Sequence, residues 1–179
     1  SVAAELERFG KSGPWSHLEP ITSIVASPMQ RTMDTASSVS TVLGGLAVTP
    51  MPGFREISFG SWDGLTNEEA LAKDPALFEA WRGSWEVSPP GGESLREFDD
   101  RIRAARNALL ENYVGQTVAL VAHVMPIRAM LRFAMAADVE AYWRPVIAPC
   151  SITILRFWGD EAAEVLAVNS TAHLSSRLN

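Results

Sequence analysis

Residues 118–128 read Val-Ala-Leu-Val-Ala-His-Val-Met-Pro-Ile-Arg, and this stretch decides the fold. The five apolar residues from Val118 to Ala122 suit a strand that is covered on both faces, as strands in parallel sheets are. His123 follows directly, and Pro126 suits the start of a helix that runs to about Met135. A buried strand followed at once by a helix is the unit from which α/β folds are built.

A second junction of the same kind lies at residues 24–31, which read Ile-Val-Ala-Ser-Pro-Met-Gln-Arg. The apolar, β-branched run Ile21 to Ala26 predicts a buried strand, and residues 29–43 predict a helix that two glycines end. Strands that alternate with helices predict an α/β fold: a three-layer sandwich with a mostly parallel central sheet, helices on both faces and an antiparallel edge strand.

The rest of the chain fits this architecture. Ser94 and Glu97 form a capping box at the start of the best-defined helix, which Gly115 ends. Hydrophobic periodicity predicts further elements in chain order: a helix at 2–9, a short strand at 47–49, a helix at 67–81 interrupted near Asp74-Pro75, and an antiparallel hairpin of 151–157 and 164–168 joined through Gly159-Asp160. The 179 residues are expected to form one domain.

Composition excludes several classes of function. The formal net charge of −6 argues against a nucleic-acid partner, which needs many Lys and Arg. No apolar run approaches the ~20 residues of a membrane helix, so no membrane partner is expected. The single Cys150 cannot form an internal disulfide, which favours a reducing compartment such as the cytoplasm. No cluster of Asp, His or Cys resembles a metal site, and neither a metal nor a cofactor is expected.

Arg31 and His123 stand just after the two predicted strands. Ligands of open α/β sheets bind outside the carboxyl ends of the strands, where helix N-termini also offer free N–H groups to an anion. Both residues are therefore candidates for binding an anionic ligand. Taken singly, an arginine in a first helical turn is more often a surface charge, and a histidine after a strand is as often a core or capping residue.

Glu56 is the third candidate. It lies in the irregular segment 54–66 among bulky apolar residues and glycines. Apolar surroundings raise the pKa of a carboxyl group, which lets the group act as a proton donor. The alternative is that Glu56 pairs with Arg55 or Arg82 at the surface.

Four motifs, in this order, resemble the histidine phosphatase (phosphoglycerate mutase-like) superfamily, and together they cover roughly residues 2–170. Residues 27–36 are similar to its Ser-Pro-x-x-Arg-x-x-x-Thr-Ala stretch and residues 54–66 to its Leu-Arg-Glu-Ile-x-x-Gly-x-Trp-Glu-Gly-x-Thr segment. Residues 90–94 match its Pro-Gly-Gly-Glu-Ser turn, and residues 121–123 match its Val-x-His strand end.

The resemblance implies a metal-free phosphatase that acts on a small phosphorylated substrate through a phosphohistidine. It implies that Arg31, His123 and the backbone N–H of Val124 bind the phosphoryl group. It also implies that Glu56 protonates the leaving alcohol and later takes a proton from water. Val124 stands where the family usually has glycine, so its side chain is expected to narrow the pocket.

The short span from Glu56 to His123 favours a phosphatase over phosphoglycerate mutase-type transfer, because the mutases of the family use a longer segment there. Residues 169–174 resemble the ending of phosphatase domains fused behind ribonuclease H in some bacteria, whose activity is acid phosphatase or alpha-ribazole phosphatase. An upstream ribonuclease H domain therefore remains open, and so, independently, does a homodimer. Trp62, Trp81 and Trp85 favour an organic leaving group, although they could equally pack only the segment over the pocket.

One departure from the family concerns the nucleophile. The sequence contains no Arg-His-Gly triplet, and its histidines are His17, His123 and His173. The domain is therefore expected to be N-terminally incomplete, with an upstream strand that ends in Arg-His-Gly beside the strands ending at Ser27 and His123. The 179 residues alone are then expected to show no turnover. The alternative is a catalytically inactive relative that binds phosphorylated ligands or a protein partner.

Overall fold

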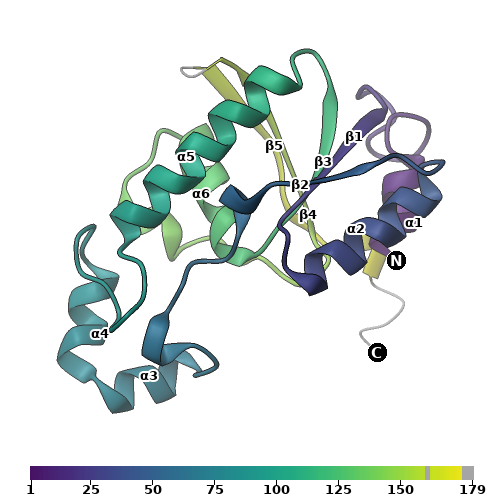
Figure 1. The fold of residues 1–179 in the computed structure, drawn as a ribbon. Coiled ribbons are helices and arrows are strands. Elements are labelled where there is room, and N and C mark those ends of the chain that lie inside the picture. The colour runs from purple at the N-terminus through teal and green to yellow at the C-terminus, as the bar shows by residue number, and fades with distance from the viewer. Residues whose placement is uncertain (160–161, 175–179) are drawn as a thin grey trace.

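The computed structural model describes residues 1–159 and 162–174 (Figure 1). In chain order the helices and strands are α1 (Val2–Arg8), β1 (Ile21–Ala26), α2 (Gln30–Val42), β2 (Val48–Pro50), α3 (Asn67–Lys73), α4 (Pro75–Arg82), α5 (Leu95–Asn112), β3 (Thr117–Val121), α6 (Val124–Ala134), β4 (Ile152–Trp158) and β5 (Ala162–Ser170). Short 3₁₀ turns lie at Pro52–Phe54, Gly60–Trp62, Val139–Tyr142 and Ala172–Leu174.

The central sheet has the strand order β2-β1-β3, and its strands are parallel. Successive residues of β1 point to opposite faces, as the period of a strand requires. Ile24 and Ala26 are buried with residues of α1 and α2, whereas Val25 is buried with residues of α5 and α6. Helices therefore cover both faces of the sheet, which confirms the predicted three-layer α/β fold.

The hairpin is where the sheet differs from the expectation. β4 and β5 pair antiparallel, as predicted, but they form a separate two-stranded sheet and not an edge of the central one. α6 packs against both strands of this hairpin. Asp160, on which the predicted turn partly falls, lies outside the described residues.

The expected place of an upstream strand must also be corrected. β1 pairs with β2 on one side and with β3 on the other, through contacts that include Ile24 with Val48 and Ala119. Because a strand has only two edges, no further strand fits beside the one that ends before Ser27. Among the described residues, the outer edge of β3 has no strand partner.

Local signals explain where the helices begin. The capping box of Ser94 and Glu97 is present at the start of α5, as predicted. A second one, of Thr66 and Glu69, starts α3. Pro75 begins α4, so the predicted interruption of this helical segment is confirmed.

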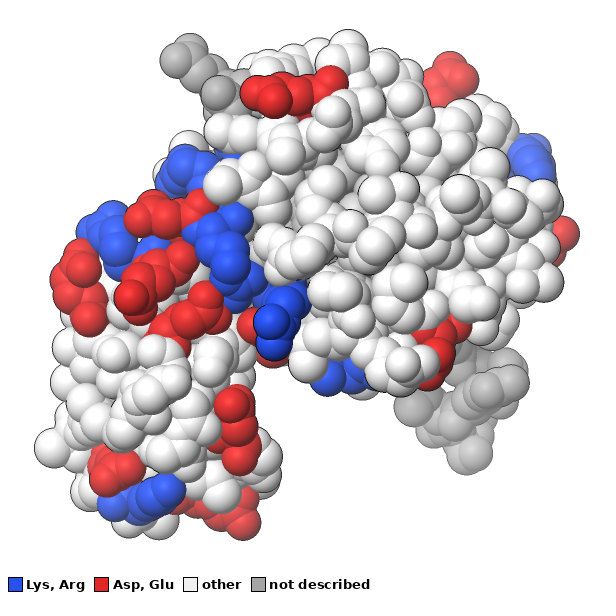
Figure 2. Space-filling view, in the orientation of Figure 1, with Lys and Arg blue, Asp and Glu red and all other residues white. Residues whose placement is uncertain are grey.

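The pair α3 and α4 extends away from the sheet and forms a lid beside the start of α5 (Figure 1). An aromatic cluster of Trp62, Phe78 and Trp81 holds this lid together, with Phe59 and Trp143 packed against it. Figure 2 shows charged side chains of both signs around this end of the molecule. No helix in the described part of the chain is long and apolar enough to cross a membrane.

Candidate active site

The three predicted site residues come from three segments and lie close together. Arg31 is in the first turn of α2, and His123 is the residue just before α6. Glu56 lies between the two 3₁₀ turns that follow β2. Burial is the main influence on the pKa of both Glu56, which is raised, and His123, which is lowered; the charge of Arg31 also acts on both groups, so its guanidinium lies within electrostatic range of each. All three therefore gather at the carboxyl ends of β1 and β3.

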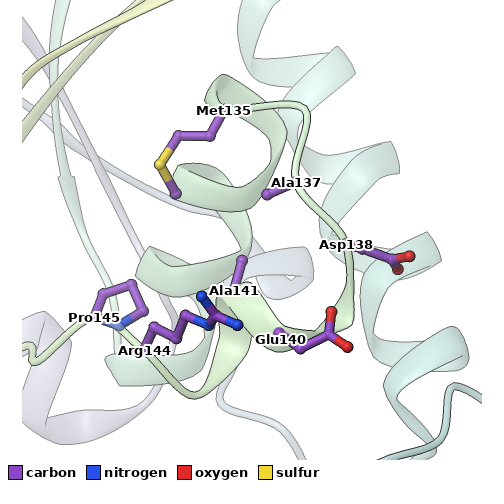
Figure 3. Close-up of a pocket in the computed structure, with 7 residues that line it drawn as sticks. All are labelled: Met135, Ala137, Asp138, Glu140, Ala141, Arg144 and Pro145. Carbon is purple, nitrogen blue, oxygen red and sulfur yellow. The ribbon is translucent and has the colours of Figure 1, made fainter.

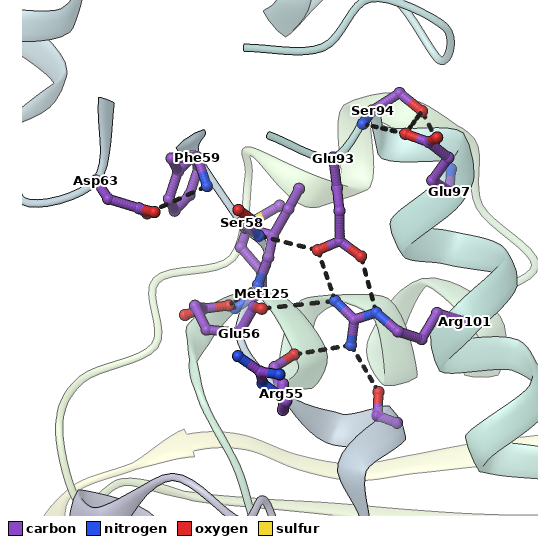
Figure 4. Close-up of polar contacts among 12 residues, drawn as sticks. Arg55, Glu56, Ser58, Phe59, Asp63, Glu93, Ser94, Glu97, Arg101 and Met125 are labelled. Carbon is purple, nitrogen blue, oxygen red and sulfur yellow. Dashed lines mark hydrogen bonds and ion pairs between the residues drawn. The ribbon is translucent and has the colours of Figure 1, made fainter. Parts of the chain in front are cut away.

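Glu56 is half-buried beside the start of α6. Its Oε1 atom accepts hydrogen bonds from the backbone N–H groups of Ile57 at 3.1 Å and Met125 at 3.2 Å (Figure 4). Burial raises the pKa of this carboxyl group, although the backbone N–H groups and Arg31 act in the opposite direction. Among the described residues Glu56 forms no ion pair with Arg55 or Arg82, so the surface-pair alternative is wrong.

His123 is buried against the strand end next to it. Its Nε2 atom lies 2.8 Å from the hydroxyl oxygen of Ser27, which is fully buried. Burial, together with the charge of Arg31, lowers the pKa of His123 to about 4. The imidazole is therefore neutral at neutral pH, and one of its nitrogens can still donate a hydrogen bond.

Val124 opens α6, and its side chain is 38% exposed on the wall of a hollow beside Glu56. Its backbone N–H is directed toward the Glu56 carboxyl group, whose pKa it lowers. The side chain therefore lines the hollow, while the N–H faces the carboxyl group.

Sequence reasoning missed the residues that hold the Glu56 loop. Arg101 of α5 donates from Nε and Nη2 to the two carboxylate oxygens of Glu93, at 2.8 and 2.7 Å. Its Nη1 atom donates to the carbonyl oxygens of Gly53 and Arg55, and Glu93 accepts the N–H of Ser58 at 2.9 Å (Figure 4). Glu93 lies in the Pro-Gly-Gly-Glu-Ser turn that matches the family, and this match could have indicated its role in holding the loop.

Glycine is required where this loop meets that turn. Gly60 has a φ of +55°, and a Cβ atom there would lie 2.3 Å from the carbonyl oxygen of Pro90. A Cβ atom on Gly92 would lie 2.5 Å from the carbonyl oxygen of Ser58. The two backbones can approach this closely only because both residues lack a side chain.

A hollow of about 310 Å³ lies beside Glu56, between the lid and α6. Its wall combines apolar and aromatic residues with charged and polar ones: Glu56, Phe59, Asn67, Phe78, Trp81, Arg82, Val124, Met125, Arg128 and Trp143. Of the three tryptophans considered above, only Trp81 lines it. Trp62 packs the lid, and Trp85 packs against Tyr142 and donates to Asp138.

Other candidate positions lie elsewhere. A second hollow of about 560 Å³, lined by residues between Met135 and Pro145, contains none of the predicted site residues (Figure 3). His17 is exposed, and the Nε2 atom of His173 lies 2.9 Å from the carbonyl oxygen of Cys150. Within the described ranges, no group of three His, Cys, Asp or Glu side chains is arranged to hold a metal ion.

The family model of the histidine phosphatase superfamily (branch 1) matches residues 6–171. The chain belongs to this superfamily. Its fold is similar to that of the mycobacterial glucosyl-3-phosphoglycerate phosphatase Rv2419c, with a TM-score of 0.76 and 27% identity over 96% of this chain and 85% of that one. It is also similar to YhfR of Bacillus stearothermophilus, with a TM-score of 0.76 and 22% identity over 97% of this chain and 83% of that one.

Sequence relatives extend this finding. The bifunctional protein Rv2228c of Mycobacterium tuberculosis is 38% identical over 154 residues, which are 86% of this chain and 42% of that protein. The chain therefore spans less than half the length of this relative. Phosphoserine phosphatase 1 of Hydrogenobacter thermophilus is 29% identical over 157 residues, which are 87% of this chain and 74% of that protein. Family and relatives support a phosphatase-type activity in general terms.

Proposed function

We propose that this domain hydrolyses phosphate monoesters through a phosphohistidine intermediate and without a metal ion. The observation that carries the proposal is the meeting of Arg31, Glu56 and His123 at the N-terminus of α6. Arg31 pairs with no carboxylate in the described part of the chain, so its charge is available to an anion. A half-buried carboxyl group with a raised pKa beside such a cation is suited to proton transfer during ester cleavage.

In this proposal Arg31 and His123 bind the phosphoryl oxygens, whose charge is spread over several atoms and needs several donors. Glu56 protonates the leaving oxygen and later accepts a proton from water. Because the N–H of Val124 faces Glu56, it contributes to phosphate binding only when the carboxyl group moves aside or carries a proton.

The nucleophile of this proposal is a histidine at the end of an upstream strand that pairs with the outer edge of β3. Two observations support that place. β3 has one strand partner among the described residues, and Val118 and Leu120, in the middle of this apolar strand, remain partly exposed. The missing partner strand would cover them and would end near His123. Residues 1–179 alone then bind a phosphate-like anion but do not turn over.

The second candidate function is an inactive relative that binds phosphorylated ligands or a protein partner. The observation in its favour is that none of the three histidines stands in an Arg-His-Gly triplet. An acid phosphatase or alpha-ribazole phosphatase type, a homodimer and a fusion to an upstream ribonuclease H domain also remain proposals. The name of the bifunctional mycobacterial relative agrees with a second activity outside the matched region.

The test uses the complete gene product with 4-nitrophenyl phosphate at mildly acidic pH. Hydrolysis is expected without added metal and should be unchanged by a chelator. Replacing His123 by Ala should lower the rate by about 10²- to 10³-fold, since it removes a donor from the developing charge. Activity that a chelator abolishes and a divalent ion restores would contradict the mechanism. Anion binding without any turnover would support the second candidate.

A further inference from the structure

Ser27 is the first residue after β1, and it is fully buried. Its backbone N–H donates to the carbonyl oxygen of Val121, the last residue of β3, at 2.9 Å. Its own carbonyl oxygen accepts a hydrogen bond from the hydroxyl of Thr32 in α2 at 2.8 Å. Pro28, the next residue, restricts Ser27 to extended backbone. The backbone of Ser27 is therefore held in place between the ends of the two strands that lead to the site.

The hydroxyl of Ser27 makes one side-chain contact in the described part of the chain, with Nε2 of His123 at 2.8 Å. A serine hydroxyl and a neutral imidazole nitrogen can each donate or accept, so the distance alone allows two arrangements. If Nε2 carried the proton and donated it to Ser27, the buried hydroxyl hydrogen would have no acceptor among the described residues. Because a buried donor without an acceptor is costly, the arrangement in which Ser27 donates to Nε2 is favoured.

The other imidazole nitrogen of His123, Nδ1, has no hydrogen-bond partner among the described residues. It is not sealed from solvent, because in this part of the chain the one buried side-chain nitrogen or oxygen without a partner belongs to Trp81. Nδ1 is therefore the nitrogen that a ligand can reach. A neutral imidazole that accepts at Nε2 carries its proton on Nδ1, so this N–H is available to an anionic oxygen.

We propose that Ser27 is a positioning residue for His123: its hydroxyl donates to Nε2 and so keeps the imidazole proton on Nδ1, where the N–H can donate to the phosphoryl group. This inference rests on the proposed function, in which His123 binds the phosphoryl oxygens. The pKa of His123 is lowered to about 4, so the ring is neutral at neutral pH and has a single N–H. The opposite tautomer would turn a nitrogen lone pair toward the phosphoryl oxygens and repel them.

The first test observes the tautomer directly, by two-bond ¹H–¹⁵N NMR correlation of the imidazole rings in the complete gene product at neutral pH. His123 should carry its proton on Nδ1, and Ser27→Thr, which keeps a hydroxyl, should leave it there. Ser27→Ala should shift the population toward the Nε2–H form, because no donor then occupies Nε2. The matched control is Ser40→Ala, near the other end of α2, which removes a hydroxyl that donates to the carbonyl oxygen of Leu46 at 2.6 Å and should leave the tautomer unchanged.

The second test is a double-mutant cycle on the hydrolysis of 4-nitrophenyl phosphate by the complete gene product. Ser27→Ala should lower kcat by about 10-fold, the range of one hydrogen bond, and Ser27→Thr should retain most of the activity. In a His123→Ala background the same Ser27→Ala substitution should have no further effect, because no imidazole remains to be oriented. Ser40→Ala should leave kcat unchanged in both backgrounds.

A wild-type His123 that carries its proton on Nε2 would overturn the inference, and this measurement needs no variant to fold. A tautomer that Ser27→Ala leaves unchanged would also overturn it. Equal losses of activity from Ser27→Ala in both backgrounds would show that Ser27 is only structural. If the complete gene product hydrolyses no ester, the proposed function fails, whereas the tautomer of His123 still decides whether Ser27 orients its N–H.

Discussion

The carboxyl group of Glu56 and the backbone N–H of Met125 are joined by a hydrogen bond of 3.2 Å, although they lie 69 positions apart in sequence. The bond connects the loop after β2 to the first turn of α6, next to His123. It also holds a carboxyl group in a place where burial raises its pKa. The position that suits Glu56 to proton transfer therefore makes its charged form unfavourable for the fold.

Replacing Glu56 by Gln should raise the stability of the fold at neutral pH. The pKa of Glu56 is higher in the folded state than in the unfolded state. Protonated Glu56 therefore stabilises the fold at low pH, and this stabilisation is lost as the pH rises through the pKa of the folded state. Above that value the buried charge opposes folding, and glutamine removes this charge while its carbonyl can still accept the two N–H groups. Melting temperatures of both forms, measured from pH 4 to 8, should differ most at the high end. A variant less stable at pH 8 would contradict this account.

The same substitution should slow ester cleavage selectively. Only a poor leaving group needs a proton from Glu56, so Glu56→Gln should reduce the hydrolysis of an alkyl phosphate by about 10²- to 10⁴-fold. The hydrolysis of 4-nitrophenyl phosphate should fall much less. Rates for both esters on the complete gene product check this, and equal losses would mean that Glu56 is only structural.

His123 should titrate far below an ordinary histidine. Its pKa is lowered to about 4, so the folded state disfavours its protonated form. The contribution of neutral His123 to the free energy of unfolding is fully present above pH 6.5 and is lost as the pH falls from about 6.5 to 4. NMR titration, with the signal assigned through a His123→Gln variant, checks the value. Orthovanadate should raise this pKa because an anion offsets the charge of Arg31, and an unchanged value would place the anion elsewhere.

Asp99 should be the ionisable residue whose loss costs the fold most. It is 3% exposed and accepts hydrogen bonds from Arg132 at 2.9 Å and from the hydroxyl of Tyr142 at 2.6 Å. Asp99→Asn leaves the Arg132 charge buried without compensation, at a cost of about 3–5 kcal/mol. The melting temperature should fall by roughly 6–20 °C for a chain of this length.

The control for Asp99 is the half-exposed ion pair of Arg156 and Glu164, whose Nη1 and Oε2 atoms lie 3.2 Å apart. Glu164→Gln should change the free energy of unfolding by only about 0–1 kcal/mol, because water screens the pair. Equal effects of the two substitutions, measured by chemical denaturation, would rule out a special role for the buried network.

Sequence reasoning could predict what depends on local signals. The apolar runs predict β1 and β3, and the capping box predicts the start of α5. Arg31 and His123 are indicated as site residues because each follows a predicted strand. The order of strands in the sheet could not be predicted from the sequence, because apolar runs do not indicate which strands pair. The direct pairing of β1 with β3 and the separate β4–β5 sheet follow from tertiary packing. Arg101 pairs with Glu93, eight positions away, and also donates to backbone carbonyls of the distant loop that carries Glu56. Hydrophobic periodicity does not indicate contacts of this kind.

The outer edge of β3 should gain a partner in the complete gene product. An apolar strand with one free edge leaves backbone N–H and C=O groups without strand partners, and pairing satisfies them. Hydrogen exchange of a peptide spanning residues 117–122 should therefore be slower in the complete gene product than in residues 1–179 alone. A peptide from α3, which packs against α4, is the internal control. Equal exchange in both proteins would show that upstream residues do not add to β3. The histidine nucleophile would then have to be sought elsewhere, or the binding function accepted in its place.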